Sequence, residues 1–222
     1  IRSVKPRNKF LEKVRYLTKE NDIPLIFDEI TSGFRMKTEG AHQSISNVKP
    51  DIAVFSKAMG NGHPIAAVIG VEKIMNYAES SFISSTFWTE KVGTVAALAT
   101  LKKHKKENVG RRLIEIGKKI RNIWTDSSKK ENLKITIGGG MEPISSFSIC
   151  CQKQKICAGC KYPQIIKTFF IEKMLERGFI ANTLFYSMYS HTDQEIKLYE
   201  NALNETFKEI SVSLTKNSME KE

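Results

Sequence analysis

The sequence predicts an α/β fold, in which a mostly parallel sheet forms a first domain and a separate α+β domain follows. Short, uniformly apolar runs follow helical or turn segments in the first half, which is typical of strands buried in a parallel sheet. After residue 127 the strand-like segments alternate apolar and polar residues instead, as half-exposed strands do. We therefore expect two domains, residues 1–106 and 107–222.

The first domain is expected to begin with a helix and to continue with three strands. Apolar residues recur at helical spacing over residues 10–17, and a polar break follows. The apolar runs 24–28, 52–56 and 65–70 predict strands, and the Gly- and Pro-containing stretch 60–64 predicts the turn before the third of them.

The second domain is expected to follow a long helix over residues 90–106. Gly178 is in a suitable place to end one of its helices, and Thr192–Glu195 reads as the capping box that opens the last. In order, the expected elements are a helix over 109–127, strands over 133–137 and 144–150, a helix over 165–177, a strand over 179–181 and the helix after Thr192. The inward faces of the first and last helices are Leu113, Ile116, Ile120, Ile123 and Trp124, and Ile196, Tyr199, Leu203, Phe207 and Ile210.

The charge balance is the composition figure that stands out. The chain of 222 residues has 35 Lys and Arg against 24 Asp and Glu, a net charge of +11, which favours anionic partners but says nothing about fold. The basic run 102–106 lies at the expected end of a helix, where positive charge complements the dipole. No aromatic stripe accompanies it, so we expect no nucleic-acid partner. No apolar stretch reaches about 18 residues, so we expect no membrane span.

The cysteines and histidines carry weaker signals. Cys157 and Cys160 form a CxxC, but Cys150 and Cys151 are adjacent in an expected strand and point to opposite faces. We therefore expect no metal site, and reduced thiols in a cytoplasmic protein. The histidines are interpreted as surface, capping or turn residues: His42, His63, His104 and His191.

Two charged residues close the first two apolar runs. Asp28 ends one run and Lys57 follows the other, about 30 residues later. Ligands of open α/β sheets bind beyond the carboxyl ends of the strands, so both side chains are expected at one crevice. Desolvation there would favour a neutral lysine amine, which can form a Schiff base with an aldehyde. The alternatives are a solvated surface lysine, and an aspartate that caps a turn or joins an ion pair.

The residues around this pair resemble a known family. The segment Asp28-Glu-Ile-Thr-Ser-Gly-Phe-Arg35 and the stretch from Pro50 through Ser56-Lys57-Ala-Met-Gly-Asn-Gly-His-Pro64 are similar to the class III (subgroup II) aminotransferases, which use pyridoxal phosphate. The likeness is greatest to the branch around glutamate-1-semialdehyde aminomutase. It continues through Ser84–Phe87 and into the small C-terminal domain, at 176–180 and 189–193.

The resemblance implies fold type I and a set of site residues. Lys57 would form the Schiff base with pyridoxal phosphate and move the proton. Asp28 would pair with the nitrogen of the cofactor ring, and Ile30 would pack against one ring face. Thr86 would donate its hydroxyl to the cofactor phosphate, in the family usually across the interface of a homodimer. Glu29 and Arg35 match the motif and are interpreted as structural support.

The departures from the family bear on the substrate. Ser32 stands where the family usually has Thr, and Trp88–Glu90 replaces a Ser-Gly-Asn often found in the aminomutase branch. We therefore predict an aminotransferase that moves an amino group between an amino acid or amine and a carbonyl compound. The alternatives are an aminomutase of the glutamate-1-semialdehyde type and a catalytically inactive basic binding module. Family members are about twice this length, so the chain is expected to be the C-terminal portion of such an enzyme.

Overall fold

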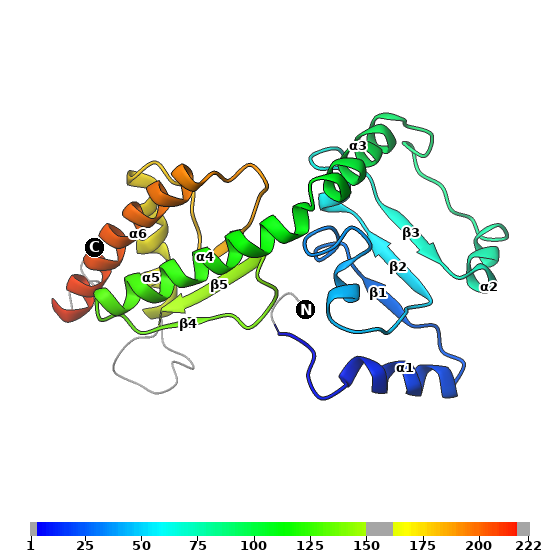
Figure 1. The fold of residues 1–222 in the computed structure, drawn as a ribbon, viewed down its shortest axis with the longest axis horizontal. Coiled ribbons are helices and arrows are strands. Elements are labelled where there is room, and N and C mark those ends of the chain that lie inside the picture. The colour runs from blue at the N-terminus through cyan, green and yellow to red at the C-terminus, as the bar shows by residue number, and fades with distance from the viewer. Residues whose placement is uncertain (1–3, 150–161, 217–222) are drawn as a thin grey trace. The chain divides into compact units, whose positions relative to one another are not determined.

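The computed structural model describes residues 4–149 and 162–216. The chain divides into two compact units, residues 1–113 and 114–222, and Figure 1 shows the helices and strands of each. The division falls within α4 (Val109–Lys130). The domain boundary expected near residue 106 stays a prediction for the whole protein.

The first unit contains a three-stranded sheet in the order β1-β2-β3. β1 and β2 are parallel, with Asp28 opposite Val54, whereas β2 and β3 are antiparallel. Its elements are α1 (Phe10–Glu20), β1 (Ile26–Asp28), η1 (Ala41–Ser44), β2 (Ile52–Phe55), η2 (Lys57–Met59), β3 (Ala67–Gly70), α2 (Glu72–Met75), η3 (Asn76–Ala78) and α3 (Val92–Lys106).

The expectation of buried, parallel strands is wrong for part of this sheet. Residues 56–66, between β2 and β3, hold only η2 and a turn, too little chain for the crossover that a parallel neighbour needs. Ile26, Val68 and Ile69 are each more than half exposed, and α1 buries no residue. One hydrophobic cluster of buried side chains in this unit lies where α3 meets the sheet, and it consists of Phe34, Ala53, Phe55, Met59 and Ala97.

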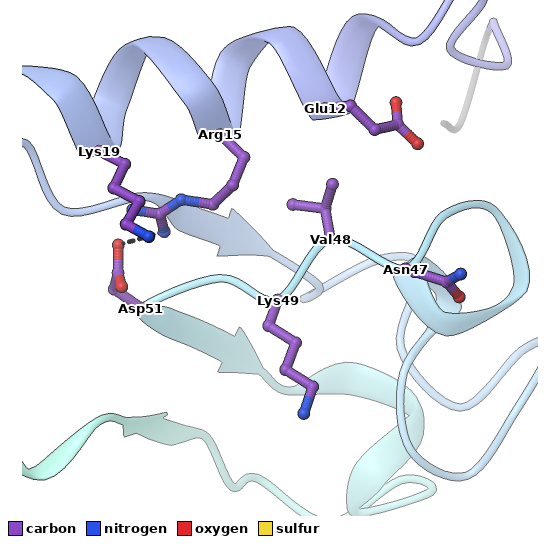
Figure 2. A pocket seen from close by; sticks show the side chains of 7 residues that line it. All are labelled: Glu12, Arg15, Lys19, Asn47, Val48, Lys49 and Asp51. Atoms are coloured by element: carbon purple, nitrogen blue, oxygen red, sulfur yellow. Dashed lines mark hydrogen bonds and ion pairs between the residues drawn. The ribbon is translucent and has the colours of Figure 1, made fainter.

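Asp51 ties α1 to the beginning of β2, as Figure 2 shows. Its Oδ2 accepts a hydrogen bond from Arg15 Nη1 at 2.6 Å and another from the Leu25 amide at 2.7 Å. Partial burial alone would raise the pKa of the Asp51 carboxyl, but these two donors outweigh it and leave the pKa below its usual value. The Asp51 carbonyl also accepts from the Val71 amide, so this residue contacts the starts or ends of all three strands.

The second unit is an α+β structure with its own core. Its elements are α4, β4 (Ile135–Ile137), β5 (Ile144–Ile149), α5 (Tyr162–Glu176), β6 (Leu184–Tyr186) and α6 (Asp193–Lys216), with the antiparallel sheet order β4-β5-β6. Phe147 of β5 lies at the centre of the core, with its ring centroid 4.7 Å from that of Trp124 and 5.7 Å from that of Phe207. The inward faces predicted for α4 and α6 are confirmed, since all ten of those side chains are buried.

Helix ends in this unit follow the sequence signals, but one strand does not. Thr192 and Glu195 form the reciprocal bonds of a capping box, and Gly178 has the expected positive φ of 82°. The strand predicted over 179–181 is wrong, and the strand lies at 184–186 instead. The Phe179 amide donates to the Met174 carbonyl, and the Ala181 amide to the Phe179 carbonyl. The chain therefore turns where a strand would need free amides.

A buried hydrogen bond in this core yields a stability prediction. Trp124 Nε1 donates to the Tyr199 hydroxyl at 2.8 Å, and both side chains are buried. We expect Tyr199→Phe to lower the free energy of unfolding by about 1–3 kcal/mol, because the indole N–H loses its acceptor. Urea denaturation followed by tryptophan fluorescence measures the change. Tyr16→Phe is the control, since Tyr16 is 64% exposed, and an equal loss in both variants would contradict the prediction.

Candidate active site

The two charged residues singled out in the sequence follow neighbouring parallel strands. Asp28 is the last residue of β1, and Lys57 begins η2 two residues after β2 ends. Because β1 and β2 are parallel, both side chains leave the sheet at its carboxyl edge. This is the edge at which open α/β sheets bind their ligands.

One hydrogen bond joins the segment of Lys57 to the turn after β1, and a second lies within that turn. Lys57 Nζ donates to Thr31 Oγ1 at 2.7 Å, and the Ile30 amide donates to Asp28 Oδ1 at 2.9 Å. Lys57 also has a φ of 46°. A non-glycine residue in this left-handed region is uncommon, and such backbone strain gathers at functional sites. The lysine amine is thus held beside the turn that follows Asp28.

Lys57 and Asp28 are both exposed in this chain. The expectation that the end of the strand would desolvate the lysine is therefore wrong for the described residues. The physical reason is that η2 turns the Lys57 side chain out of the sheet toward Thr31, while Met59 joins the core and Ala58 packs against it.

Glu29, between the site residues Asp28 and Ile30, is buried and fully bonded. Its side chain is 2% exposed, and its carboxylate accepts four hydrogen bonds. The donors are the Ser32 hydroxyl, the amides of Ala41 and His42, and His42 Nδ1. A buried carboxylate needs such donors, and this set agrees with the structural role that the sequence suggested for Glu29.

Two histidines interpreted as surface or capping residues are buried, which corrects that reading. His42 is 6% exposed and pairs with Glu29. His104 of α3 is also 6% exposed, with Nδ1 2.8 Å from Thr38 Oγ1 and Nε2 2.8 Å from the Phe34 carbonyl oxygen. Burial lowers the pKa of His104, against the opposing effect of the Phe34 bond. The lysines beside His104 are exposed, as expected for a solvated helix end.

Thr86 and Ile30, the other predicted cofactor contacts, lie in different surroundings. Ile30 is partly buried in the turn after β1, next to the Asp28 carboxylate. Thr86 lies in an exposed turn over 86–89, ahead of α3. Glu90 then caps α3, and bonds from the amides of Gly93 and Val92 lower the pKa of the Glu90 carboxyl. The structure brings Asp28, Ile30 and Lys57 to one edge, and Thr86 belongs to a separate segment.

Two open grooves lie in the first unit. One of about 680 Å³ runs between α1 and residues 47–51, lined by Arg15, Lys19, Lys49 and others, and Figure 2 shows the Arg15–Asp51 ion pair at one end of it. A second, of about 670 Å³, is formed by 64–66 and 85–94, the stretch around Thr86. Neither lining includes Asp28 or Lys57, so these two residues lie outside both grooves.

The cysteines, possible metal ligands and possible membrane spans were also considered in the sequence. The four cysteines, Cys150, Cys151, Cys157 and Cys160, lie outside the described residues. Over residues 4–149 and 162–216, no three or more His, Cys, Asp or Glu side chains gather as a metal site would require. No helix in those ranges combines the length and apolar character needed to cross a membrane.

Thr31 is the site residue that the sequence reasoning missed. It lies three residues after Asp28, and its hydroxyl accepts the hydrogen bond from Lys57. The available signal was its place in the turn beyond β1, at the edge where Lys57 was already expected. A hydroxyl in the turn after β1 is within hydrogen-bonding reach of a side chain that follows β2, such as Lys57.

The fold of the chain matches those of solved proteins, transaminases among them. It overlays the FumI protein of Sphingopyxis sp. MTA144 with a TM-score of 0.82, at 20% identity over 93% of this chain and 48% of that one. An S-selective transaminase from Arthrobacter sp. gives 0.77, at 20% identity over 94% and 49%. Together with a lysine and an aspartate at adjacent strand ends, this defines the fold of the type I pyridoxal-phosphate-dependent transferases, as predicted.

The family follows from the sequence comparison. The family model for class-III aminotransferases matches residues 3–179, and the chain belongs to that family. It is 31% identical to a 3-aminobutyryl-CoA aminotransferase of Cloacimonas acidaminovorans over 94% of this chain and 49% of that protein. It is 33% identical to a glutamate-1-semialdehyde 2,1-aminomutase of Clostridium kluyveri, over 88% and 48%. The chain thus spans about half the length of the curated relatives it matches.

Proposed function

We propose that the whole protein is a pyridoxal-phosphate-dependent aminotransferase that moves an amino group between an amino acid or amine and a carbonyl compound. The observation that carries the proposal is the pair of Lys57 and Asp28 on adjacent parallel strand ends, in a chain of the class-III family. An amine and a carboxylate so placed fit a cofactor that has an aldehyde and a basic ring nitrogen.

Each residue of the edge has a distinct part in this chemistry. When bound, pyridoxal phosphate supplies an electron sink for negative charge at the amino carbon. The Lys57 amine would hold the cofactor covalently and, once free, would take a proton from one carbon and return it to another. Thr31 accepts the hydrogen bond from Lys57 Nζ and holds that amine near the turn. Asp28 would hold a proton on the ring nitrogen, and Ile30 would pack against the ring.

The test is a covalent mark on the lysine. The whole protein, purified with pyridoxal phosphate, is expected to absorb visible light and to lose that absorption on treatment with borohydride. Peptide mass mapping should then find the reduced cofactor on Lys57. An unmodified Lys57 in protein that has kept its cofactor would contradict the proposal.

Glutamate-1-semialdehyde aminomutase activity is the second candidate function, and the names of several similar proteins support it. Several proteins that this chain resembles carry that name, including those of Clostridium kluyveri and Clostridium perfringens. An aminotransferase consumes a separate carbonyl compound for each amine it converts, whereas an aminomutase returns the amine to the same carbon skeleton. Measuring whether a second carbonyl substrate is consumed separates the two.

A homodimer with the active site at the subunit interface is part of the same proposal. The segment that precedes and begins α3 presents large apolar side chains to solvent in this chain, and such patches mark interfaces. Phe82 is 98% exposed, Phe87 77%, Trp88 66% and Val95 65%. Thr86 lies in this segment, which is consistent with a contact to cofactor phosphate in a second subunit. Light scattering that reports a single-chain mass would contradict the dimer.

Location of the protein in the cytoplasm stays a prediction.

A further inference from the structure

The buried pair of Glu29 and His42 is the polar cluster closest to the catalytic edge that the reaction does not use directly. The Glu29 carboxylate is 2% exposed and the His42 side chain 8% exposed, with His42 Nδ1 2.8 Å from Glu29 Oε1. The backbone amide of His42 donates to the same oxygen at 2.8 Å. One residue thus supplies both bonds to Oε1.

This pair joins two pieces of irregular chain. Glu29 belongs to the turn after β1, and His42 to η1 (Ala41–Ser44). The His42 ring also meets the Phe27 ring of β1 edge to face, with centroids 5.5 Å apart. Gly40 has a φ of 111°, and a Cβ there would lie 2.9 Å from His42 Nδ1. The loop that leads into η1 is therefore shaped around the histidine.

Glu29 is also fixed through its own backbone. Its amide donates to the Val54 carbonyl of β2 at 2.8 Å, and its carbonyl accepts from the Gly33 amide at 2.7 Å. The residues on either side carry the chemistry, since Asp28 precedes Glu29 and Thr31 follows two residues later. If the Glu29 side chain lost its anchor, the turn could rotate about these two backbone bonds. Such a rotation would move the Asp28 carboxylate and the Thr31 hydroxyl together.

We propose that His42 is a positioning residue, which acts through Glu29 to hold Asp28 and Thr31 in the orientation that the cofactor and Lys57 require. The proposal rests on the proposed function, because it assigns the two positioned groups to a bound pyridoxal phosphate. His42 itself does not touch the reacting atoms. Its contribution is the donor at Nδ1, which a buried carboxylate needs in order to keep one orientation.

A matched pair of substitutions in the whole protein isolates that donor. His42→Asn keeps a nitrogen donor bonded to Cγ, where the ring carries Nδ1, whereas His42→Leu fills a similar volume without any donor. We expect His42→Leu to weaken pyridoxal phosphate binding by about tenfold or more, and His42→Asn by less than about threefold. Titration of the apoprotein with pyridoxal phosphate, followed by its visible absorption, measures both.

A second readout separates positioning from plain stability. Visible circular dichroism of the bound cofactor reports how rigidly the cofactor is oriented, so His42→Leu should reduce this signal per bound cofactor, and His42→Asn should keep it. Far-ultraviolet circular dichroism and the thermal midpoint of each apoprotein show whether the variant is folded. A purely structural histidine would lower the midpoint of His42→Leu and leave the affinity and the cofactor signal of the folded protein unchanged, which would overturn the proposal.

Ser32→Ala keeps the proposal testable if His42→Leu does not fold. It removes a different one of the four donors, the hydroxyl 2.6 Å from Glu29 Oε2, and is expected to weaken cofactor binding about two- to fivefold. Unchanged binding and unchanged dichroism in Ser32→Ala would then overturn the proposal. A wild-type protein that forms no borohydride-sensitive bond at Lys57 would instead overturn the proposed function.

Discussion

Alanine in place of Lys57 is expected to lower turnover by the whole protein roughly 10²–10⁴-fold, the usual contribution of a positioned acid–base group. The variant should also lose the covalent link, so that peptide mass mapping after borohydride treatment finds no reduced cofactor at position 57, because no amine remains there to bond the cofactor. The Thr31 hydroxyl, which lies 2.7 Å from the Lys57 amine in the unaltered protein, cannot replace that amine, because a hydroxyl is far less basic. Steady-state kinetics and peptide mass mapping measure the two losses separately.

Three further measurements sharpen this expectation. Lys57→Arg keeps a cation that can donate to Thr31 but cannot lose its proton, so it should be as inactive as alanine. A small added amine such as methylamine should restore part of the activity of Lys57→Ala and none of that of Lys57→Arg. Lys73→Ala is the control, because Lys73 is 83% exposed and its Asp22 partner 95% exposed. Turnover by Lys57→Ala close to that of Lys73→Ala would refute the assignment.

The sequence was sufficient to predict that Asp28 and Lys57 lie at one edge of the sheet, because that placement depends on strand ends. Short apolar runs reveal where strands stop, and parallel neighbours end at the same side of a sheet. Asp28 and Lys57 could therefore be brought together without any tertiary information. The long helices of the second unit were predictable for a related reason, since the apolar stripe of α6 repeats at the helical period.

The contacts around that edge depend on irregular backbone, which leaves no periodic signal. Thr31 meets Lys57 only because Lys57 adopts a φ of 46° and turns its side chain toward β1. His42 meets Glu29 through a loop shaped by Gly40. A histidine in a polar stretch reads as a surface residue, and its burial follows from a carboxylate thirteen positions earlier in the chain.

Exposure was predicted poorly for another physical reason. An apolar strand has the same sequence pattern whether one face or both faces are covered. Ile26 and Ile69 match a doubly buried strand but are 56% and 57% exposed in this chain. What covers such a face is set by other parts of a protein, and the run of residues in the strand does not encode it.

Asparagine in place of Asp28 is expected to lower turnover roughly 10²–10³-fold. This is the effect of leaving the charged ring nitrogen of the bound cofactor without its carboxylate partner. The substitution keeps the side-chain oxygen that accepts the Ile30 amide at 2.9 Å, so the turn after β1 should be preserved. Lys57 is untouched, and the covalent bond to the cofactor should still form. The loss should therefore appear in turnover, while the reduced cofactor should still be found on Lys57 after borohydride treatment, in contrast to Lys57→Ala.

A cofactor with a permanent charge distinguishes the role of Asp28 from a general disturbance of the site. Pyridoxal phosphate methylated at the ring nitrogen keeps its positive charge without a carboxylate to hold the proton. Asp28→Asn reconstituted with this cofactor should regain about tenfold or more of its lost turnover, if the carboxylate acts by keeping the ring nitrogen charged. Asp22→Asn, at a 95% exposed side chain, serves as the control. If the methylated cofactor restores nothing while the turn remains intact, Asp28 does not pair with the ring, and its bond to the Ile30 amide is its whole function.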